Sequence, residues 1–299
     1  MQSLSEKIDQ YLLDLAWSLW TELGVAGVKR RHQTSLIFLE ELILLTVILS
    51  DKDPRLRDEA LDWCVRHHHF VSISRLQTLI KSLGSSIHQP FSLFAVTLNA
   101  VSRSKWPVFV KAAPLKFTPS EKSRPPQCEL PSLLSLRLRA LFGVGARSDL
   151  MTFFLTQRRG EFTAADTAEI GYSKRSLAAL LEDFVRSGFF DSYTVQNKRY
   201  YRFIKRDLMT KTVGRLPKIT PPWRQFIEIL LPLRSCIQQV EKKSEVTKLV
   251  EIKKALLKVE NQLHRLSVVT PPSLESDPSV YWNSFADWIL KILKNFAGT

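Results

Sequence analysis

Residues 163–190 read TAADTAEIGYSKRSLAALLEDFVRSGFF, and this stretch decides the fold of the middle of the chain. Thr163 stands three residues before Asp166, a spacing close to the capping box that begins many helices. The short helix that would start there is stopped by Gly171, and Ser173 caps the next helix. In this second helix, apolar side chains recur at spacings of three and four residues and form one buried face: Leu177, Leu180, Leu181, Phe184 and Val185.

A hairpin pattern follows Gly188, which ends the second helix. The sequence FFDSYTVQNKRYYRF holds two β-prone runs, Phe189 to Val195 and Arg199 to Phe203, separated by the polar turn Gln196-Asn197-Lys198. Runs rich in aromatic and β-branched residues on either side of a short polar turn predict a β-hairpin.

An earlier helix precedes Thr163 and ends near Gly160, with one apolar face made of Leu150, Phe153, Phe154 and Leu155. Helix, short helix, glycine turn, longer helix and hairpin is the order of a winged helix-turn-helix. Residues from about Ser148 to Phe203 resemble the bacterial MarR- and ArsR-like winged-helix domains, and the resemblance covers roughly 60 of the 299 residues. It implies a winged-helix fold and binding of double-stranded DNA.

The resemblance also implies which residues face the DNA. In such domains the second helix of the motif enters the major groove by its N-terminal end, here Ser173, Lys174, Arg175 and Ser176. Arg175 is expected to read a base, because its guanidinium can bond to guanine O6 and N7 together. Tyr172, Ser173 and Lys174 are expected to contact phosphate, as is Thr163 at the start of the preceding helix. Glu182 and Asp183 make the later turns acidic, so contact is expected in the first turn only.

The charge of the chain supports an anionic partner. Lys and Arg number 43 against 29 Asp and Glu, which gives +14 and a pI near 9.8. Eight of the basic residues lie between Asn197 and Lys218, against the single acidic residue Asp207: Lys198, Arg199, Arg202, Lys205, Arg206, Lys211, Arg215 and Lys218. This concentration favours nucleic acid, with an acidic protein partner as the alternative. Lys198, Arg199 and Arg202 are the predicted DNA contacts of the hairpin.

The whole chain predicts a mainly α protein of three regions. Residues 1–110 read as a helical bundle, and the proline-punctuated residues 111–131 read as a linker. Residues 132–216 hold the winged helix-turn-helix with its small β-hairpin, and residues 217–299 form a helical C-terminal region.

The C-terminal region carries a short heptad seam, in which apolar residues alternate by three and four: Leu249, Ile252, Leu256, Val259, Leu263 and Leu266. Two interpretations of this seam are possible from the sequence. The seam either joins two copies of the chain or packs within its own domain. A homodimer is favoured by the paired half-sites that helix-turn-helix proteins commonly read.

Several classes of function are not supported. The three cysteines are far apart and form no CxxC pair, which favours a reducing cytoplasm over a disulfide framework. The apolar run 34–50 is shorter than a membrane span and carries Glu40 and Glu41, so it predicts a buried helix. The N-terminus lacks the order of a signal peptide.

No catalytic or metal-binding motif stands out either. Neighbouring helical side chains diverge, so His67, His68 and His69 are not expected to share a metal ion. No nucleophile signature is found, and neither an enzyme activity nor a cofactor is predicted.

These observations predict a cytoplasmic DNA-binding transcriptional regulator, most simply a repressor, whose flanking helical regions serve dimerisation, ligand sensing or partner capture. The alternative is the antitoxin or adaptor of a toxin or defence operon, which would hold a protein partner in its helical regions and autoregulate through the winged helix. The architecture loosely resembles the winged-helix antitoxins of nucleotidyltransferase toxins.

Overall fold

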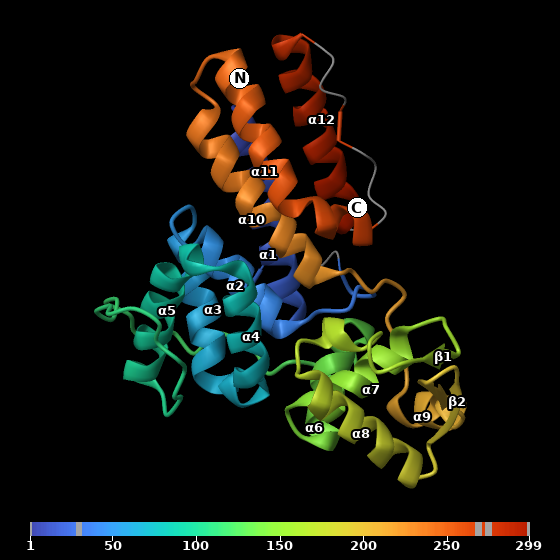
Figure 1. Ribbon diagram of the computed structural model, residues 1–299. Coiled ribbons are helices and arrows are strands. Elements are labelled where there is room, and N and C mark those ends of the chain that lie inside the picture. The colour runs from blue at the N-terminus through green and yellow to red at the C-terminus, as the bar shows by residue number, and fades with distance from the viewer. Residues whose placement is uncertain (1, 28–31, 267–270, 273–276, 298–299) are drawn as a thin grey trace.

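The computed structural model describes residues 2–27, 32–266, 271–272 and 277–297. It is mainly helical with one small antiparallel sheet, which confirms the predicted fold class. The buried residues form two clusters, and each cluster is the core of one lobe. The large lobe contains the first five helices and the last three, and the small lobe lies between them in the sequence (Figure 1).

The first half of the large lobe consists of α1 (Leu4–Glu22), α2 (Leu39–Leu49), α3 (Pro54–His67), α4 (Ile73–Leu83) and α5 (His88–Val101). The apolar run around α2 forms a buried helix, as the sequence predicts, and all of its residues are buried, Glu40 and Glu41 included. Asp53 caps α3 by accepting a hydrogen bond from the Leu56 N–H at 3.1 Å. Because α2 is buried on every side, it lies at the centre of the lobe.

The second half consists of α10 (Trp223–Val240), α11 (Glu245–Arg265) and α12 (Pro278–Ala297), which pack with α1 in the upper part of Figure 1. Their buried side chains belong to the same cluster as those of α1–α5, so the two helical regions that the sequence separates pack together. A buried ion pair reinforces this junction, because Arg234 Nε lies 2.6 Å from Asp9 Oδ1.

The heptad seam of α11 faces the interior of its own lobe. Ile252, Val259 and Leu263 are buried, and Leu249, Leu256 and Leu266 pack half-buried against the same core. The seam therefore packs against the core of its own lobe. Other apolar residues lie on the outer face of this helix, and they are exposed: Val246, Val250 and Leu257.

Residues 111–130 of the predicted linker contain no regular secondary structure, and Pro131 begins a 3-10 helix, but polar contacts hold the segment against the large lobe. Asp62 Oδ1 accepts hydrogen bonds from the N–H groups of Ser120 and Glu121, and the Arg124 N–H donates to the Gly24 carbonyl at 2.9 Å. Gly24 has φ of 99°, and a Cβ there would lie 2.4 Å from the Arg124 carbonyl oxygen. Only glycine fits this close approach.

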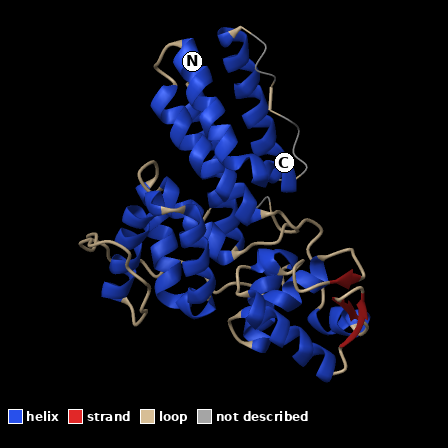
Figure 2. Ribbon diagram, viewed as in Figure 1, coloured by secondary structure: helices blue, strands red, loops and turns tan. Residues whose placement is uncertain are grey.

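The small lobe is built from α6 (Leu134–Phe142), α7 (Ala146–Thr156), β1 (Glu161–Phe162), η4 (Ala168–Ile170), α8 (Lys174–Arg186), β2 (Phe190–Val195), β3 (Lys198–Phe203) and α9 (Arg206–Val213). The strands pair in the order β1-β3-β2, all antiparallel, at the edge of this lobe (Figure 2). Aromatic rings fill its core, with Phe154 in edge-to-face contact with Phe162 and Phe190.

Two details of the small lobe differ from the expectations. The short helix predicted after Thr163 is a series of turns ending in the 3-10 helix η4, although Asp166 Oδ2 does accept hydrogen bonds from the N–H and hydroxyl of Thr163. The hairpin turn consists of two residues, Gln196 and Asn197, with φ of 46° and 61°. Lys198 already belongs to β3, opposite Val195. Two positive φ values give the turn the twist that a two-residue hairpin needs.

The chain enters and leaves the small lobe at neighbouring points. Residues 33–37 run between the two junctions, where the Ser132 N–H donates to the Gln33 carbonyl and the Leu36 N–H donates to the Ile219 carbonyl. Ser35 and Ile219 form an isolated parallel bridge. The small lobe is thus an insertion between α5 and α10. Within the described ranges, no helix has the length and apolar character that a membrane crossing requires.

Candidate nucleic-acid interface

The first turn of α8 is the most exposed basic part of the helix. Ser173 caps it, and Ser173 Oγ accepts from the Ser176 N–H at 3.2 Å. Leu177, Leu181 and Phe184 are buried in the core of the small lobe, which turns the opposite face of the helix outward. Four predicted contact residues lie together and exposed at this end: Ser173, Lys174, Arg175 and Ser176.

Lys174 and Arg175 form no ion pair with any residue that the structure describes. The later turns differ, because their two carboxylates are neutralised. Glu182 Oε2 lies 2.7 Å from Arg199 Nη2, and Asp183 lies 3.2 Å from Arg186 Nη1. The acidic character that the sequence suggests for these turns is therefore offset, and the uncompensated charge of α8 lies at its N-terminal end.

The hairpin is attached to α8 by side-chain contacts. Tyr201, buried in the sheet, donates its hydroxyl to Glu182 Oε1 at 2.7 Å. Arg199 lies over the Tyr201 ring and also donates to Ser192 Oγ at 3.0 Å. The hairpin and the helix therefore form one unit.

The three predicted hairpin contacts fall into two groups. Arg199 pairs with Glu182, and Arg202 pairs with Asp191 at 3.0 Å, so internal carboxylates already engage both arginines. Lys198, beside the turn, is exposed and has no ion-pair partner among the described residues. The positive charge of the hairpin that no described carboxylate pairs with therefore lies at its tip, on Lys198.

Two predicted phosphate contacts lie elsewhere. Tyr172 is mostly enclosed: its hydroxyl donates to Asp149 Oδ2 at 2.8 Å and lies 2.8 Å from Ser72 Oγ on the large lobe. Burial raises the pKa of this tyrosine. The hydroxyl of Thr163 is bonded to Asp166. Both hydroxyls therefore stabilise the fold, and neither belongs to the exposed turn of α8.

A buried ionic cluster joins the two lobes, and the sequence analysis did not predict which residues make it up. It contains Glu40 and Glu41 of α2, Arg75 of α4, Arg139 of α6 and Asp149 of α7, and all five are at most 3% exposed. Arg75 Nη1 and Arg139 Nη1 each lie 2.7 Å from one oxygen of Glu40, and Arg139 Nη2 lies 2.9 Å from Asp149 Oδ1. Arg75 also bonds to Glu41.

The two neighbouring glutamates differ in their electrostatics. Burial acts to raise the pKa of Glu40, but the positive charges of Arg139 and Arg75 lower it to about 2. Burial raises the pKa of Glu41 to about 7, because the positive charge of Arg75 offsets only part of the desolvation and the negative charge of Glu40 raises the pKa further. Two carboxylates inside an apolar helix do indicate that buried positive charges lie near them. They do not indicate which residues of the sequence supply those charges.

The cluster reaches the turn that precedes α8. Arg75 Nε donates to the Ile170 carbonyl at 3.0 Å. The next residue, Gly171, has φ of 90°, and a Cβ there would lie 3.4 Å from Arg75 Cγ. Two contacts therefore hold the start of α8 against the large lobe: the Ile170 carbonyl bonds to Arg75, and the Tyr172 hydroxyl bonds to Ser72.

The chain matches no protein-family model, no curated protein and no solved structure.

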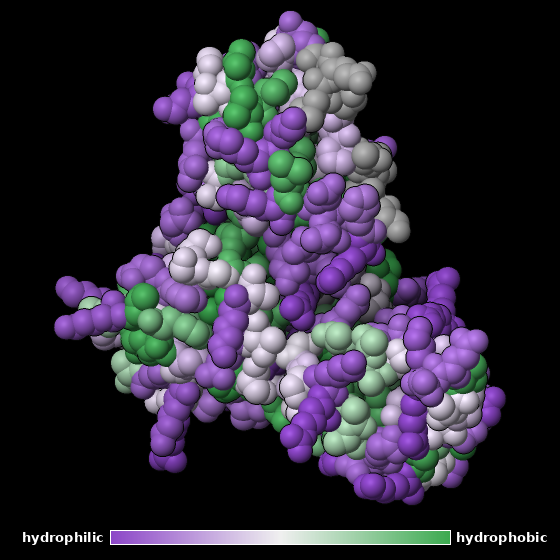
Figure 3. All heavy atoms as spheres, in the orientation of Figure 1, coloured by the Kyte–Doolittle hydropathy of each residue, from purple (hydrophilic) through white to green (hydrophobic). Residues whose placement is uncertain are grey.

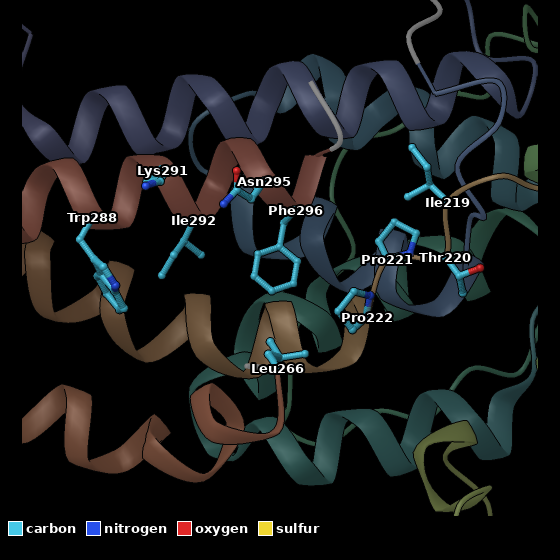
Figure 4. A pocket seen from close by; sticks show the side chains of 10 residues that line it. All are labelled: Ile219, Thr220, Pro221, Pro222, Leu266, Trp288, Lys291, Ile292, Asn295 and Phe296. Carbon is cyan, nitrogen blue, oxygen red and sulfur yellow. The ribbon is translucent and has the colours of Figure 1, made fainter. Parts of the chain in front are cut away.

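Two cavities lie near the junction of the lobes. The first, of about 360 Å³, is mostly apolar and lies between α12, Leu266 at the end of α11 and the loop that leaves the small lobe (Figure 4). Phe296 and Pro222 approach each other across it, and Lys291 carries its only charged side chain among the described lining residues. The second, of about 170 Å³, is bordered by Glu41 and Arg75 of the ionic cluster.

Proposed function

We propose that this protein is a DNA-binding regulator and that its small lobe acts as a winged helix-turn-helix. One observation carries the proposal: the first turn of α8 presents Lys174 and Arg175 outward, uncompensated by any described carboxylate, next to a hairpin bonded to the same helix. Hydrophilic side chains cover much of the visible face of the small lobe (Figure 3), as a surface that meets a charged, hydrated polymer requires.

The proposed geometry follows from simple dimensions. An α-helix with its side chains is about 10–12 Å wide, and the major groove of B-DNA is about 12 Å wide. With α8 inserted by its N-terminal end, Arg175 meets a base edge, while Ser173, Lys174 and Ser176 are near phosphates. Lys198 at the hairpin tip contacts the backbone beside the groove. Arg199 and Arg202 contribute to DNA binding indirectly, because they stabilise the sheet.

The basic residues of the hairpin and of the segment that follows it supply affinity for DNA of any sequence. Of the eight basic residues between Asn197 and Lys218, six form no ion pair with a described carboxylate: Lys198, Lys205, Arg206, Lys211, Arg215 and Lys218. If roughly five to eight phosphates are contacted, the logarithm of the affinity falls against the logarithm of the salt concentration with a slope of about −4 to −7.

The first experiment titrates the protein with a random duplex at several salt concentrations and records fluorescence anisotropy. A steep negative slope supports the proposal. Absence of binding at low salt, or an affinity that does not change between low and physiological salt, contradicts it. That outcome favours a protein partner, with the small lobe as an adaptor. Light scattering of the same samples gives the number of chains per duplex.

The second experiment separates base reading from phosphate contact, using a duplex selected from a random pool and a scrambled version of it. Arg175→Ala is expected to cost about 1–3 kcal/mol on the selected duplex and much less on the scrambled one, since a bidentate guanine contact is lost. Lys198→Ala is expected to weaken both duplexes alike and to reduce the salt slope by about one.

Arg186→Ala is the matched control. Arg186 lies in the last turn of the same helix, is exposed, and is engaged by Asp183. Its removal should leave both affinities within a factor of about two. Equal losses on the two duplexes for Arg175→Ala would make Arg175 a phosphate contact, and no loss for Arg175 and Lys198 would mean that α8 does not face DNA.

A further inference from the structure

The net charge of the chain is concentrated in two segments of equal length. Residues 197–218, at and after the hairpin, carry eight basic residues and one acidic residue, whereas residues 103–124 carry six basic residues and one acidic residue. Together the two segments account for +12 of the formal net charge of +14. Residues 103–124, here called the basic loop, follow α5, and their basic residues are Arg103, Lys105, Lys111, Lys116, Lys122 and Arg124.

All six basic side chains of this loop are exposed, and none forms an ion pair with a carboxylate that the structure describes. The one acidic residue of the loop, Glu121, lies 3.4 Å from Arg66 of α3. Burial alternates at the start of the loop, where Ser104 is buried between the exposed Arg103 and Lys105. The positive charges therefore point away from the large lobe and are free to meet an anion.

Buried hydroxyl groups of α5 hold the backbone of the basic loop in place. Ser92 Oγ accepts hydrogen bonds from the N–H groups of Phe109 and Val110, at 3.0 and 3.1 Å. Thr97 Oγ1 accepts from the Leu115 N–H at 2.9 Å. Both of these α5 residues are fully buried. A partner that binds the basic side chains therefore does not have to order the backbone that carries them.

The basic loop and the hairpin lie at opposite edges of the molecule. In Figure 1 the loop that follows α5 is at the left edge, and β1 and β2 are at the right edge. Hydrophilic side chains project from the left edge in Figure 3. A duplex segment that docks on α8 and the hairpin therefore leaves the basic loop free for a second segment.

The basic loop suits a phosphate backbone better than a lipid surface. A segment that binds a membrane surface combines its charges with exposed apolar side chains that enter the bilayer. Here the aromatic side chains turn inward: Trp106 is buried, Phe109 stacks on His88 with 4.9 Å between the ring centroids, and Phe117 packs against the large-lobe core. Within this fully described loop, Val108 is the only exposed large apolar side chain. Unpaired positive charges without an apolar surface match sequence-independent contact with phosphates.

We infer that the basic loop is a second DNA-binding surface, which contacts the phosphate backbone without reading the sequence. While α8 holds one duplex segment, the lysines and arginines of the loop pair with the phosphates of another, so one protein molecule bridges two segments. The identity of the polyanion as DNA rests on the proposed function, whereas the surface itself does not depend on α8. If four to six phosphates are contacted, the salt slope of this surface is about −4 to −5.

The first test removes the contacts proposed for the small lobe by combining Lys174→Ala, Arg175→Ala and Lys198→Ala. Fluorescence anisotropy then measures the binding of the random duplex at several salt concentrations. This triple variant should still bind the duplex at low salt, with a slope of about −4 to −5, because the basic loop is intact.

Reversing two charges of the loop in the triple variant, Lys111→Glu and Lys116→Glu, should weaken this remaining binding at low salt at least about tenfold. The control is Lys242→Glu with Lys243→Glu, which makes the same change in net charge at two exposed lysines between α10 and α11. The control should change the affinity by less than about threefold. An equal effect of the two pairs would show that only the overall charge matters and would overturn the inference.

The second test measures bridging directly. One duplex is attached to beads, a second duplex carries a fluorophore, and the fluorescence retained on the beads is recorded. Wild-type protein should retain the second duplex. Lys111→Glu with Lys116→Glu, in an otherwise wild-type chain, should lose this retention and still bind a single duplex through the small lobe. Retention by this variant would mean that copies of the protein associate with one another, and no retention by the wild type would mean that bridging does not occur. Either result overturns the inference.

The outcomes separate this inference from the proposed function. If the wild type and the triple variant bind the random duplex equally, and the reversal of Lys111 and Lys116 abolishes both, the role of α8 is wrong and the basic loop is the DNA-binding surface. Vesicles of phosphatidylcholine and phosphatidylserine test the lipid alternative. Vesicle binding that the reversal abolishes, with duplex binding unchanged, would overturn the inference in favour of a membrane surface.

Discussion

Replacing Arg139 by methionine should lower the free energy of unfolding by about 3–5 kcal/mol, the usual cost of breaking a buried ion pair from one side. Arg139 is fully enclosed and bonds to both oxygens of Glu40, to Asp149 and to the Phe70 carbonyl. Methionine has a similar length but donates nothing, so Glu40 keeps only Arg75 and the Ser72 N–H as donors, and Asp149 keeps only Tyr172.

Urea denaturation at pH 7, followed by circular dichroism, measures this loss. Arg202→Met is the control, because Arg202 also pairs with a carboxylate, Asp191, but both side chains are about half exposed. Exposed pairs of this kind contribute about 0–1 kcal/mol. If Arg139→Met costs no more than Arg202→Met, the cluster does not hold the lobes together. Adding Glu40→Gln to Arg139→Met should recover part of the loss.

The second large effect concerns pH. The pKa of Glu41 is raised by burial to about 7 from an ordinary value of 4.5, so its contribution to stability is fully present below about pH 4.5 and is lost as the pH rises through 7. A shift of this size corresponds to about 3 kcal/mol. The difference in unfolding free energy between the wild type and Glu41→Gln should therefore move by about 3 kcal/mol against the wild type between pH 4.5 and pH 8.

The effect of pH on the stability that Glu40 contributes has the opposite sign and falls in a different pH range. The charges of Arg139 and Arg75 overcome the effect of burial and bring its pKa to about 2, so the stability that it contributes is present above about pH 4.5 and is lost below, toward pH 2. Denaturation series at pH 4.5, 6, 7 and 8 isolate Glu41. A difference between the wild type and Glu41→Gln that is independent of pH would show that folding does not raise the pKa of Glu41.

The features that the sequence predicted correctly depend on near neighbours. The cap of α8 at Ser173, its buried face and the hairpin after it are each set within about four positions, where helical and strand periodicity apply. The short helix before Gly171 was expected from a cap and a stop alone, and the segment lacks the apolar repeat that would sustain a full turn of α-helix.

The features that the sequence left open depend on distant residues. Glu40 and Glu41 were visible as carboxylates in an apolar run, but their cations lie 35 and 99 positions away from Glu40, and no periodicity links them. The heptad seam suited both a second copy and its own lobe, and the homodimer was favoured only by analogy, because an apolar stripe does not specify which surface covers it. Likewise, the basic count at the hairpin could not indicate that Arg199 is engaged by Glu182.

The insertion of the small lobe has a consequence for how the protein is made. Every residue of the small-lobe core except Leu36 lies between Leu134 and Val213, so this lobe can form as soon as that stretch has left the ribosome. The large lobe must wait for α10–α12, which are synthesised after the small lobe, to cover α1. During translation, more than a hundred residues must therefore be synthesised after the first five helices before the exposed apolar face of these helices is covered. We expect chaperones to bind this segment in the meantime.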